Sequence, residues 1–410
     1  MKVVIIGAGP AGVTVAERLR QHDKTAEIMM ISSEPHPPYS PPAMLEYFTT
    51  GRDVHFWKGK DFAKVLNIDY RSGTKVEAIA PDKRGVRLAG GESVSYDRLV
   101  LASGARLYAP LKGEDRPGIY NFKSLSAAEE LMAKVRDGRA RSSLIVGAGF
   151  IGVEIGLLLA DMGLKVTQLV RSRVMRTMLD AETSQIVQQV MEKRGIRVLQ
   201  GADADAVAFV GEPRAEAVQT RSGDVLRADL VVAATGLKPN IDYLDGCGIK
   251  TDWGVLVDDH LCTNLPEISA AGDIALTVDR ITGERGIHGN FPNAVAQGQV
   301  VAYNLLGWDV SYEGADSMNS LKHLGLPLIA LGQMEGEELR VKHGDSVRKL
   351  YLQNNCIVGF RLFGDVSSAG IYRTLMNKRV HVAAFKHRLL EPGFGMGFVE
   401  GLALHELSVT

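Results

Sequence analysis

The sequence predicts an α/β protein built from two similar units and a smaller third one, and two observations support this prediction. The stretches "KVVIIGAGPAGVTVAE" (2–17) and "SLIVGAGFIGVEIG" (143–156) each place an apolar run before G-x-G-x-x-G and a helical pattern after it. Further on, 97–105 and 228–240 each hold an apolar run that ends in a glycine-containing turn of small residues. A strand, a glycine turn and a helix in this order are typical of a parallel βαβ unit.

Composition excludes several classes of protein. A chain of 410 residues is long enough for two or three domains of about 150 residues. Its 47 Lys and Arg against 48 Asp and Glu give a net charge of −1, so nothing attracts nucleic acid. No stretch reaches the roughly 20 uninterrupted apolar residues of a membrane span, and we expect a cytoplasmic location. The spacing of the three cysteines, Cys247, Cys262 and Cys356, matches no zinc or iron–sulfur pattern, so we expect no metal.

The first glycine turn has the features of a Rossmann dinucleotide-binding site. Gly7 would make the tight turn, Gly9 would let the backbone approach a pyrophosphate, and Gly12 would let helix and strand pack closely. The N-terminus of the following helix offers N–H groups and a partial positive charge to phosphates. Glu34 ends the next strand pattern, 22 residues after Gly12, where a carboxylate can accept hydrogen bonds from both ribose hydroxyls of an adenosine. The alternative for Glu34 is a solvated strand-end carboxylate.

The second glycine turn, at 147–152, repeats the pattern without the acid. Val170 stands where the acid is expected, and three arginines follow: Arg171, Arg173 and Arg176. A carboxylate repels a 2′-phosphate, whereas arginine forks bind it. The sequence therefore slightly favours NADPH over NADH, and the alternative is that these arginines are merely solvated.

The order of the motifs predicts that the second unit is inserted in the first. The stretch 266–275 is one more strand pattern, ending at Gly272 and Asp273, without a third fingerprint. The predicted fold is thus two Rossmann-like dinucleotide-binding domains plus a C-terminal α+β domain. We expect an FAD-binding domain in two pieces, 1–110 and 245–317. A NAD(P)H-binding domain would span 111–244, and a C-terminal interface or acceptor domain would span 318–410.

The C-terminal part carries a different pattern. Residues 338–365 alternate at period two and are interrupted by "HGD" and "QNN", which predicts an antiparallel meander. Residues 366–379 then read as a helix with serine at its start. The final stretch 394–407 has no clear period, so both a docking tail and simple core packing stay open.

In this order, GAGPAG, Glu34, ASG, GAGFIG, ATG and AAGD resemble the two-dinucleotide-binding-domain flavoprotein reductases, the pyridine nucleotide–disulfide oxidoreductase family. The branch that resembles the chain most contains the NAD(P)H–rubredoxin, ferredoxin and nitrite reductase flavoproteins. The resemblance implies FAD on the first unit, contacted by Gly7, Gly9, Pro10, Ala11, Gly12, Glu34, Ser40, Pro42, Val76, Ala102, Ser103, Gly104, Gly272, Asp273, Asn290, Phe291 and Pro292. It implies NAD(P)H on the second unit, contacted by Gly147, Gly149, Phe150, Ile151, Gly152, Arg171, Arg173, Arg176, Thr235 and Gly236.

A predicted helix adds a further candidate contact with the flavin. Pro292 followed by "NAVAQGQVVAYNLL" reads as a helix start, because proline suits the first turn. By the resemblance this N-terminus is aimed at the isoalloxazine and Asp273 binds the ribityl or phosphate region. The helix dipole would favour the negative charge of reduced flavin. His288 could contribute there, or be a hydrogen-bonded loop residue.

The chain departs from the disulfide reductases of this family. It has no cysteine before Cys247, so the relay thiol that disulfide, peroxide and coenzyme A disulfide reductases need beside the flavin is missing. The Y-x-[RK]-P loop of the rubredoxin and ferredoxin reductases reads Tyr39-Ser40-Pro41-Pro42, and Glu46 stands near the place of a lysine found in relatives. Glu154 is the candidate catalytic residue, because the resemblance puts it where nicotinamide meets the flavin. The alternative is a helix-face glutamate that satisfies the dipole.

These observations predict an FAD-dependent NAD(P)H oxidoreductase of the electron-transfer type. A hydride would pass from NAD(P)H to FAD, and electrons would go on to a rubredoxin, a ferredoxin or an iron–sulfur partner subunit, in either direction. Two alternatives stay open: an NAD(P)H oxidase that uses oxygen, and a redox-sensing flavoprotein resembling apoptosis-inducing factor. A homodimer and a subunit of a larger complex are both compatible with the sequence.

Overall fold

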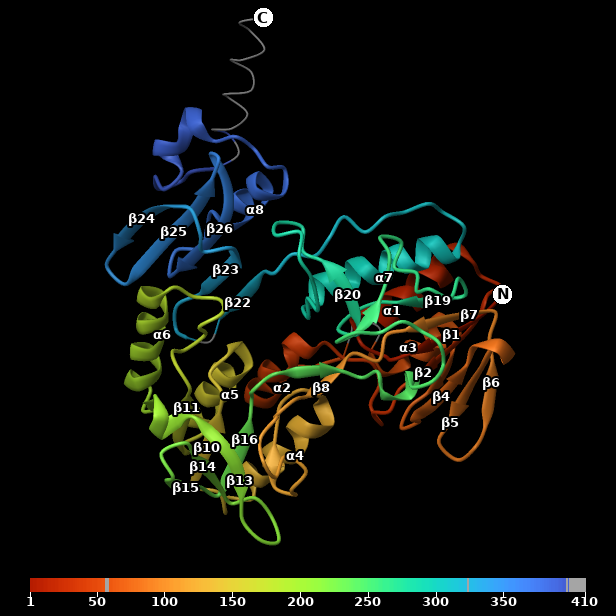
Figure 1. The fold of residues 1–410 in the computed structure, drawn as a ribbon, viewed down its shortest axis with the longest axis horizontal. Coiled ribbons are helices and arrows are strands. Elements are labelled where there is room, and N and C mark those ends of the chain that lie inside the picture. Colours follow the sequence, from red (N-terminus) through yellow and green to blue (C-terminus); the bar gives the residue numbers. More distant parts are fainter. Residues whose placement is uncertain (56–58, 323, 396, 398–410) are drawn as a thin grey trace, which may run out of the picture.

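The structure is a computed structural model of the chain, and it describes residues 1–55, 59–322, 324–395 and 397. Three units are visible in Figure 1: one is red to orange with the green-to-teal elements from β19 to α7, one is yellow to green, and one is blue. Most of the stretch 394–407, whose role the sequence left open, lies outside the described residues. None of the described helices is long and apolar enough to cross a membrane.

A parallel five-stranded sheet forms the centre of the first unit. The strand order is β19-β7-β1-β2-β3. Four of these strands come from the first quarter of the chain: β1 (Lys2–Ile6), β2 (Glu27–Ile31), β3 (Asp69–Arg71) and β7 (Arg98–Leu101). The fifth, β19 (Ile268–Ala270), comes after the whole second unit in the sequence. Helix α1 (Pro10–His22) packs against α7 (Phe291–Leu305). The chain therefore returns to its first sheet after building the second one.

A second parallel sheet repeats this arrangement. Its order is β12-β11-β10-β16-β9, with strands β9 (Ile119–Tyr120), β10 (Ser142–Val146), β11 (Lys165–Val170), β12 (Arg197–Gln200) and β16 (Leu230–Ala233). The helices of this unit are α4 (Leu125–Arg136), α5 (Phe150–Asp161) and α6 (Ala181–Lys193). In both sheets the strand before the G-x-G-x-x-G turn has the same two neighbours. β1 lies between β2 and β7, and β10 lies between β11 and β16.

The duplication extends to a small antiparallel meander in each unit. These meanders consist of β4 (Val76–Ala80), β5 (Gly85–Leu88) and β6 (Ser93–Ser95), and of β13 (Ala206–Val210), β14 (Ala217–Thr220) and β15 (Val225–Arg227). The chain crosses between the units twice, and the two crossings pair as antiparallel strands, β8 (Ala105–Leu107) with β17 (Leu237–Pro239). The first unit is completed by α2 (Met44–Thr50), α3 (Phe62–Leu66), β18 (Val255–Leu256), β20 (Ala275–Val278) and β21 (Arg285–Gly286).

In its described residues, the third unit is an antiparallel sheet with one α-helix. The order is β22-β23-β26-β25-β24, and the elements are β22 (Asn319–Leu321), β23 (Leu328–Gly332), β24 (Glu337–His343), β25 (Ser346–Gln353), β26 (Cys356–Phe363) and α8 (Ala369–Asn377). The predicted meander and helix are thus present. Asn354 and Asn355 turn the chain with positive φ. Ser368 precedes α8, but its hydroxyl donates to the Phe394 carbonyl and does not cap the helix.

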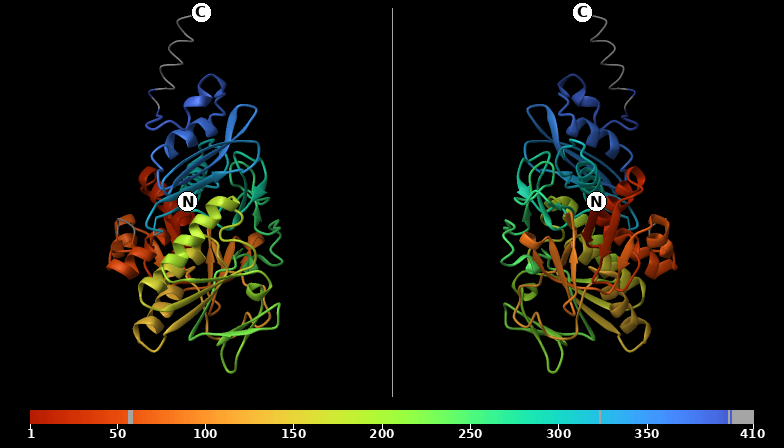
Figure 2. Two further views of the ribbon diagram at one scale, coloured as in Figure 1. Left: turned by 90° about the vertical axis from the view of Figure 1, so that its left-hand side faces the viewer. Right: turned by 90° about the vertical axis from the view of Figure 1, so that its right-hand side faces the viewer.

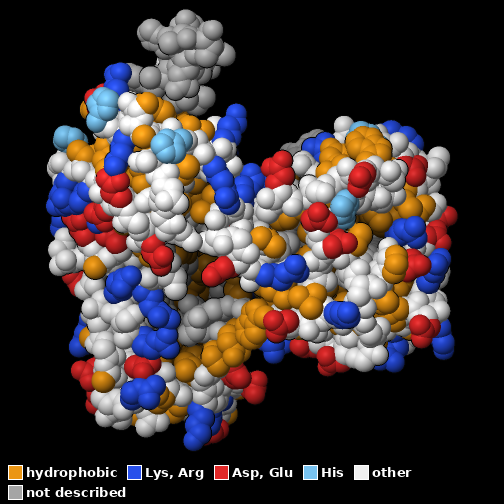
Figure 3. Space-filling model, turned by 45° about the horizontal axis from the view of Figure 1, so that its top comes forward, with side chains coloured by type: hydrophobic (Ala, Val, Ile, Leu, Met, Phe, Trp, Pro, Cys, Tyr) orange, Lys and Arg blue, Asp and Glu red, His pale blue; other side chains and the backbone are white. Residues whose placement is uncertain are grey.

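A buried lysine joins the third unit to the second. Lys349 in β25 is only 4% exposed, and its ammonium lies 2.7 Å from Asp180 and 2.9 Å from Glu182, at the start of α6. Figures 1 and 2 show the blue sheet above α6, away from the parallel sheet of the first unit. In the space-filling view the surface is hollowed between the first unit and the column formed by the other two, with hydrophobic side chains along the hollow (Figure 3).

Candidate functional site

A cavity of about 500 Å³ lies at the carboxyl ends of the second parallel sheet. Open α/β sheets bind ligands at this edge. Its wall contains all but one of the residues that the sequence assigned to the nicotinamide coenzyme: Gly147, Gly149, Phe150, Ile151, Arg171, Arg173, Arg176, Thr235 and Gly236. Gly152 is buried beneath it, where a Cβ would lie 2.5 Å from the Gly147 carbonyl oxygen. Leu107, Tyr108 and Lys123 complete part of the wall from the first crossing and the segment after it.

The helices that follow the two glycine turns begin without a side-chain cap. The N-cap residues of α1 and α5 are Gly9 and Gly149, both in extended conformation. A Cβ at either glycine would meet nothing within 4 Å. Helices α4, α6 and α7, in contrast, are capped by the side chains of Ser124, Asp180 and Asn290. Open space in front of free N–H groups fits a pyrophosphate at each of the two turns.

The three arginines after β11 have different roles in the structure. Arg173 donates to the carbonyls of Arg176 and Leu179, so it holds the loop together. Arg171 and Arg176 are exposed, and within the described part of the chain neither guanidinium group has a hydrogen-bond or ion-pair partner. These two guanidinium groups are therefore free to meet a phosphate at the rim of the cavity.

The strand registers correct the position that the sequence gave to the missing acid. Ile6 pairs with Ile31, and Val146 pairs with Leu169. Counting three residues beyond each partner places Ser172, and not Val170, opposite Glu34. The conclusion that no acidic side chain follows this strand still holds, because 170–173 reads Val-Arg-Ser-Arg.

Glu34 lies where the first unit meets α4. It accepts a hydrogen bond of 2.9 Å from the Tyr39 hydroxyl, and longer ones of 3.4 Å from the backbone and hydroxyl of Ser126. Burial and the Glu34 charge together raise the pKa of Tyr39 well above its ordinary value. The Tyr39 hydroxyl also accepts from the Leu125 amide at 3.0 Å. Both Ser126 donors meet Oε2, whereas Oε1 accepts only from Tyr39 and keeps a second lone pair for a ribose hydroxyl.

The other residues assigned to FAD in 40–104 contribute mainly backbone. Ser40 begins the short turn before α2 and Pro42 is exposed in it. The Val76 side chain is buried in the first core, so a ligand could reach only its backbone. Ala102 packs under the first turn, where a Cβ on Gly7 would lie 2.0 Å from its carbonyl oxygen. Ser103 hydrogen-bonds to the Asn240 carbonyl and Tyr243, and Gly104 follows with φ of +65°.

Asp273 forms an ion pair that joins the two units. The Lys123 ammonium lies 2.9 Å from its carboxylate. Gly272 before it has φ of +81° and donates to the Gln297 side chain, and Gly289 lies so close that a Cβ would be 3.2 Å from the carboxylate. Lys123 also lines the cavity at the carboxyl ends of the second sheet. The sequence analysis missed Lys123, because no local motif marks it and its partner is 150 residues away.

Helix α7 starts at Phe291, with Pro292 in its first turn as predicted. Asn290 caps the helix through the Asn293 amide, and both asparagines donate to the Asp316 carbonyl. This end of the helix is therefore anchored to the segment that leads into the third unit.

His288 and Glu154 both carry polar side-chain atoms that lack a hydrogen-bond partner among the described residues. Nδ1 of His288 is 3.3 Å from the Ser317 hydroxyl and 3.9 Å from Asp279, and its buried Nε2 has no partner among the described residues. Glu154 on α5 likewise has no ion-pair or hydrogen-bond partner there, and it does not line the cavity. Burial raises the pKa of Glu154 to about 7. Glu46 pairs with Arg52 on the surface, so it takes no part at this site.

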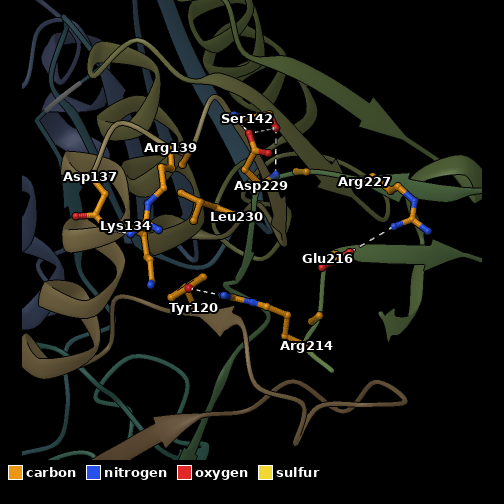
Figure 4. Close-up of a pocket in the computed structure, with 13 residues that line it drawn as sticks. Tyr120, Lys134, Asp137, Arg139, Ser142, Arg214, Glu216, Arg227, Asp229 and Leu230 are labelled. Carbon is orange, nitrogen blue, oxygen red and sulfur yellow. Dashed lines mark hydrogen bonds and ion pairs between the residues drawn. The ribbon is translucent and has the colours of Figure 1, made fainter. Parts of the chain in front are cut away.

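A larger cavity of about 610 Å³ lies at the opposite edge of the second sheet (Figure 4). Here Asp229 accepts from the amides of Arg141 and Ser142, and Arg214 donates to the Tyr120 hydroxyl at 2.6 Å. Ser142 begins β10, so this cavity is at the amino ends of the strands. The Gly147 turn follows the other end of β10, so this position does not suit a dinucleotide site.

Comparison with known proteins identifies the family. A family model described as pyridine nucleotide-disulphide oxidoreductase matches residues 1–298. Rhodocoxin reductase of Rhodococcus erythropolis is 31% identical over 394 residues, 94% of this chain and 89% of that protein. NADH oxidase of Methanocaldococcus jannaschii is 31% identical over 324 residues, 76% of this chain and 71% of that protein.

Among solved structures, a ferredoxin reductase of Rhodopseudomonas palustris superposes with a TM-score of 0.86 at 26% identity, covering 97% of this chain and 99% of that one. The predicted fold class is therefore confirmed. The chain belongs to the pyridine nucleotide-disulphide oxidoreductase family of FAD- and NAD(P)H-dependent enzymes.

Proposed function

We propose that this chain is a flavoprotein reductase that takes a hydride from NADPH and passes electrons singly to a small iron–sulfur protein or an iron–sulfur subunit. Residues 1–110 with 245–317 would hold FAD, 111–244 the coenzyme, and 318–410 would contact the acceptor. The observation that carries the proposal is the pair of uncapped helix N-termini, one at each glycine turn, in a chain whose first cysteine, Cys247, comes after both turns in the sequence.

Residues of the first unit are suited to bind and orient FAD. The free N–H groups at the start of α1 meet the pyrophosphate, and Glu34 has acceptor capacity for the adenosine ribose. Asp273 is fixed by Lys123 at 2.9 Å, beside the closely packed Gly289. When bound, FAD supplies a two-electron acceptor for hydride and a one-electron donor to the partner.

Residues of the second unit are suited to bind NADPH. The start of α5 offers N–H groups to the pyrophosphate, and Arg171 and Arg176 offer unpaired guanidinium groups to a 2′-phosphate. The absence of an acid from 170–173 removes the repulsion that would select NADH.

Two observations support an iron–sulfur acceptor: the lack of a cysteine in the first part of the chain, and the share of the chain that each relative covers. Without a cysteine before Cys247, electrons have no thiol relay beside the first turn. The similarity to rhodocoxin reductase spans 94% of the chain, which includes the third unit, whereas the similarity to NADH oxidase spans 76%. A carrier protein is therefore favoured over oxygen as the acceptor.

Anaerobic titration of the purified yellow protein with NADPH tests this function. We expect the flavin absorbance to bleach rapidly, and to do so equally in a variant with Cys247, Cys262 and Cys356 all replaced by alanine. The bleached protein should reduce a ferredoxin faster than it reduces oxygen. Loss of bleaching in the cysteine variant, or faster turnover with oxygen alone, would overturn the proposal.

A further inference from the structure

A glutamine is buried in the middle of the second parallel sheet. Gln168 lies in β11, its side chain has no exposed surface, and its Nε2 donates to the Gly147 carbonyl at 2.7 Å. Its Oε1 is buried and has no partner among the described residues. A carbonyl oxygen can only accept, so the amide nitrogen must face Gly147 and the orphaned oxygen must point away. A buried acceptor without a donor destabilises the fold, so this arrangement calls for a reason.

Helix α5 leaves room for this side chain. A Cβ on Gly156 would lie 2.6 Å from Oε1 of Gln168, and one on Gly152 would lie 3.1 Å from Nε2. Gly156 therefore has to be glycine for Gln168 to fit. A glycine inside a helix is less favourable than alanine, so Gly156 lowers stability further, in addition to the buried oxygen without a partner.

The first unit shows what the same positions hold without this interaction. Ile5 pairs with Met30 in the first sheet, as Ile145 pairs with Gln168 in the second. Met30 thus takes the place of Gln168, and Ala16 of α1 takes the place of Gly156. Within the described residues no side chain donates to the Gly7 carbonyl. An apolar pair is therefore sufficient for the strand, turn and helix to pack.

A second contact holds the turn of the second unit and has no counterpart at the first turn among the residues that the structure describes. The Met175 amide donates to the Ala148 carbonyl at 2.7 Å, from the loop that carries the arginines. Two successive carbonyls of the coenzyme turn are therefore held by donors from β11 and from the loop after it. A nicotinamide coenzyme has to bind and leave in every cycle, and a preformed site reduces the entropy lost at each binding.

We propose that Gln168 is a positioning residue that holds the Gly147–Gly149 turn in the conformation that binds the coenzyme pyrophosphate, and that Gly156 is present to admit it. The inference rests on the proposed function in that this turn binds the coenzyme. Gln168 does not touch the coenzyme itself and acts through the Gly147 carbonyl.

The double variant Gln168→Met with Gly156→Ala installs the pair of the first unit and separates positioning from packing. It removes the orphaned oxygen and the helix glycine, so the free energy of unfolding should be unchanged or higher. We expect the dissociation constants for ADP-ribose and for NADP⁺, measured by calorimetry, to rise about fivefold. The flavin content should not change. Because ADP-ribose lacks nicotinamide, its binding reports on the turn and not on hydride transfer.

A second variant, Gln168→Glu, adds a pH signature that packing alone would not produce. The protonated carboxyl can donate to the Gly147 carbonyl, whereas the ionised form places an oxygen against it. Affinity for ADP-ribose should therefore be close to that of the unaltered protein at low pH and fall as pH rises.

Two results would overturn the inference: wild-type affinity in the double variant, or no pH dependence specific to Gln168→Glu. Failure of the proposed function looks different, because the unaltered protein would then bind neither ADP-ribose nor NADP⁺.

Discussion

The two glycine turns share a backbone and differ in what surrounds it. The Gly7 amide donates to Ile31 at 2.8 Å, and the Gly147 amide donates to Leu169 at 3.0 Å. Around the first turn lie apolar side chains and, further out, an acid. Around the second lie a buried amide, a loop hydrogen bond and free arginines. We therefore expect the repeated backbone to bind a pyrophosphate in each unit, and the residues outside the repeat to decide the choice of nucleotide and its exchange.

The sharpest way to break this comparison is to add a methyl group at each tight turn. Gly7→Ala would put a Cβ 2.0 Å from the Ala102 carbonyl, and Gly147→Ala would put one 2.4 Å from the Ala234 carbonyl, both at positive φ. We expect each change to lower the free energy of unfolding by about 2–4 kcal/mol. Gly7→Ala should be isolated with little flavin, whereas Gly147→Ala should keep its flavin and not bleach with NADPH.

A matched control for both is Gly163→Ala. Gly163 also has positive φ, +87°, but a Cβ there meets nothing within 4 Å. It should lose only about 1–2 kcal/mol and retain both ligands. The expected difference between the two turns would be contradicted if Gly147→Ala lost its flavin and Gly7→Ala kept it. Flavin-to-protein ratio, denaturant unfolding and NADPH bleaching supply the measurements.

The arginine loop allows coenzyme choice to be separated from loop support. Arg171→Ala should raise the Michaelis constant for NADPH about tenfold and spare NADH, because only NADPH carries the 2′-phosphate. Arg173→Ala should weaken both coenzymes to a similar degree, since this side chain holds the carbonyls of Arg176 and Leu179. Steady-state kinetics with each coenzyme provide the test. Equal effects of Arg171→Ala on NADH and NADPH would remove the case for a 2′-phosphate site.

The repeated part of the molecule could be predicted from the sequence, because its signals are local. Strand, glycine turn and helix follow one another within 20 residues, so the two sheets and the inserted order could be inferred from the motifs. The meander of the third unit was equally visible from its period of two. The same local pattern predicted the residues for the nicotinamide coenzyme, and all but Gly152 line the cavity at the carboxyl ends of the second sheet, whose ligand stays a prediction.

The contacts between distant segments could not be predicted from local patterns. Lys123 meets Asp273 and Lys349 meets Asp180 only after the chain has folded. Gln168 was hidden for another reason. A single polar residue in an apolar run looks like an ordinary interruption of the strand, and its partner is a backbone carbonyl with no sequence signature. The missing acid was placed two residues too early because Val170 is the last residue of β11, whereas Glu34 lies three residues beyond the end of β2.

The smallest expected effect concerns one helix position at which the two copies differ. Thr14 of α1 is buried, and its hydroxyl donates to the Pro10 carbonyl at 2.7 Å. Glu154 takes the corresponding place in α5, and burial raises its pKa from 4.5 to about 7. The folded protein therefore holds this proton more tightly than the unfolded chain does. Stability should then fall as pH rises from about 4.5 to 7, the reverse of the usual behaviour of a carboxyl group.

Glu154→Gln should remove this pH dependence. We expect the variant to match the unaltered protein near pH 4.5 and to exceed it in free energy of unfolding by about 1–2 kcal/mol above pH 7. Thr14→Val is the matched change in the first copy. It removes a neutral hydrogen bond, so its loss of about 1 kcal/mol should be the same at every pH. Denaturant unfolding of the three proteins across this range gives the result. A constant difference between Glu154→Gln and the unaltered protein would mean that Glu154 is already ionised in the folded chain.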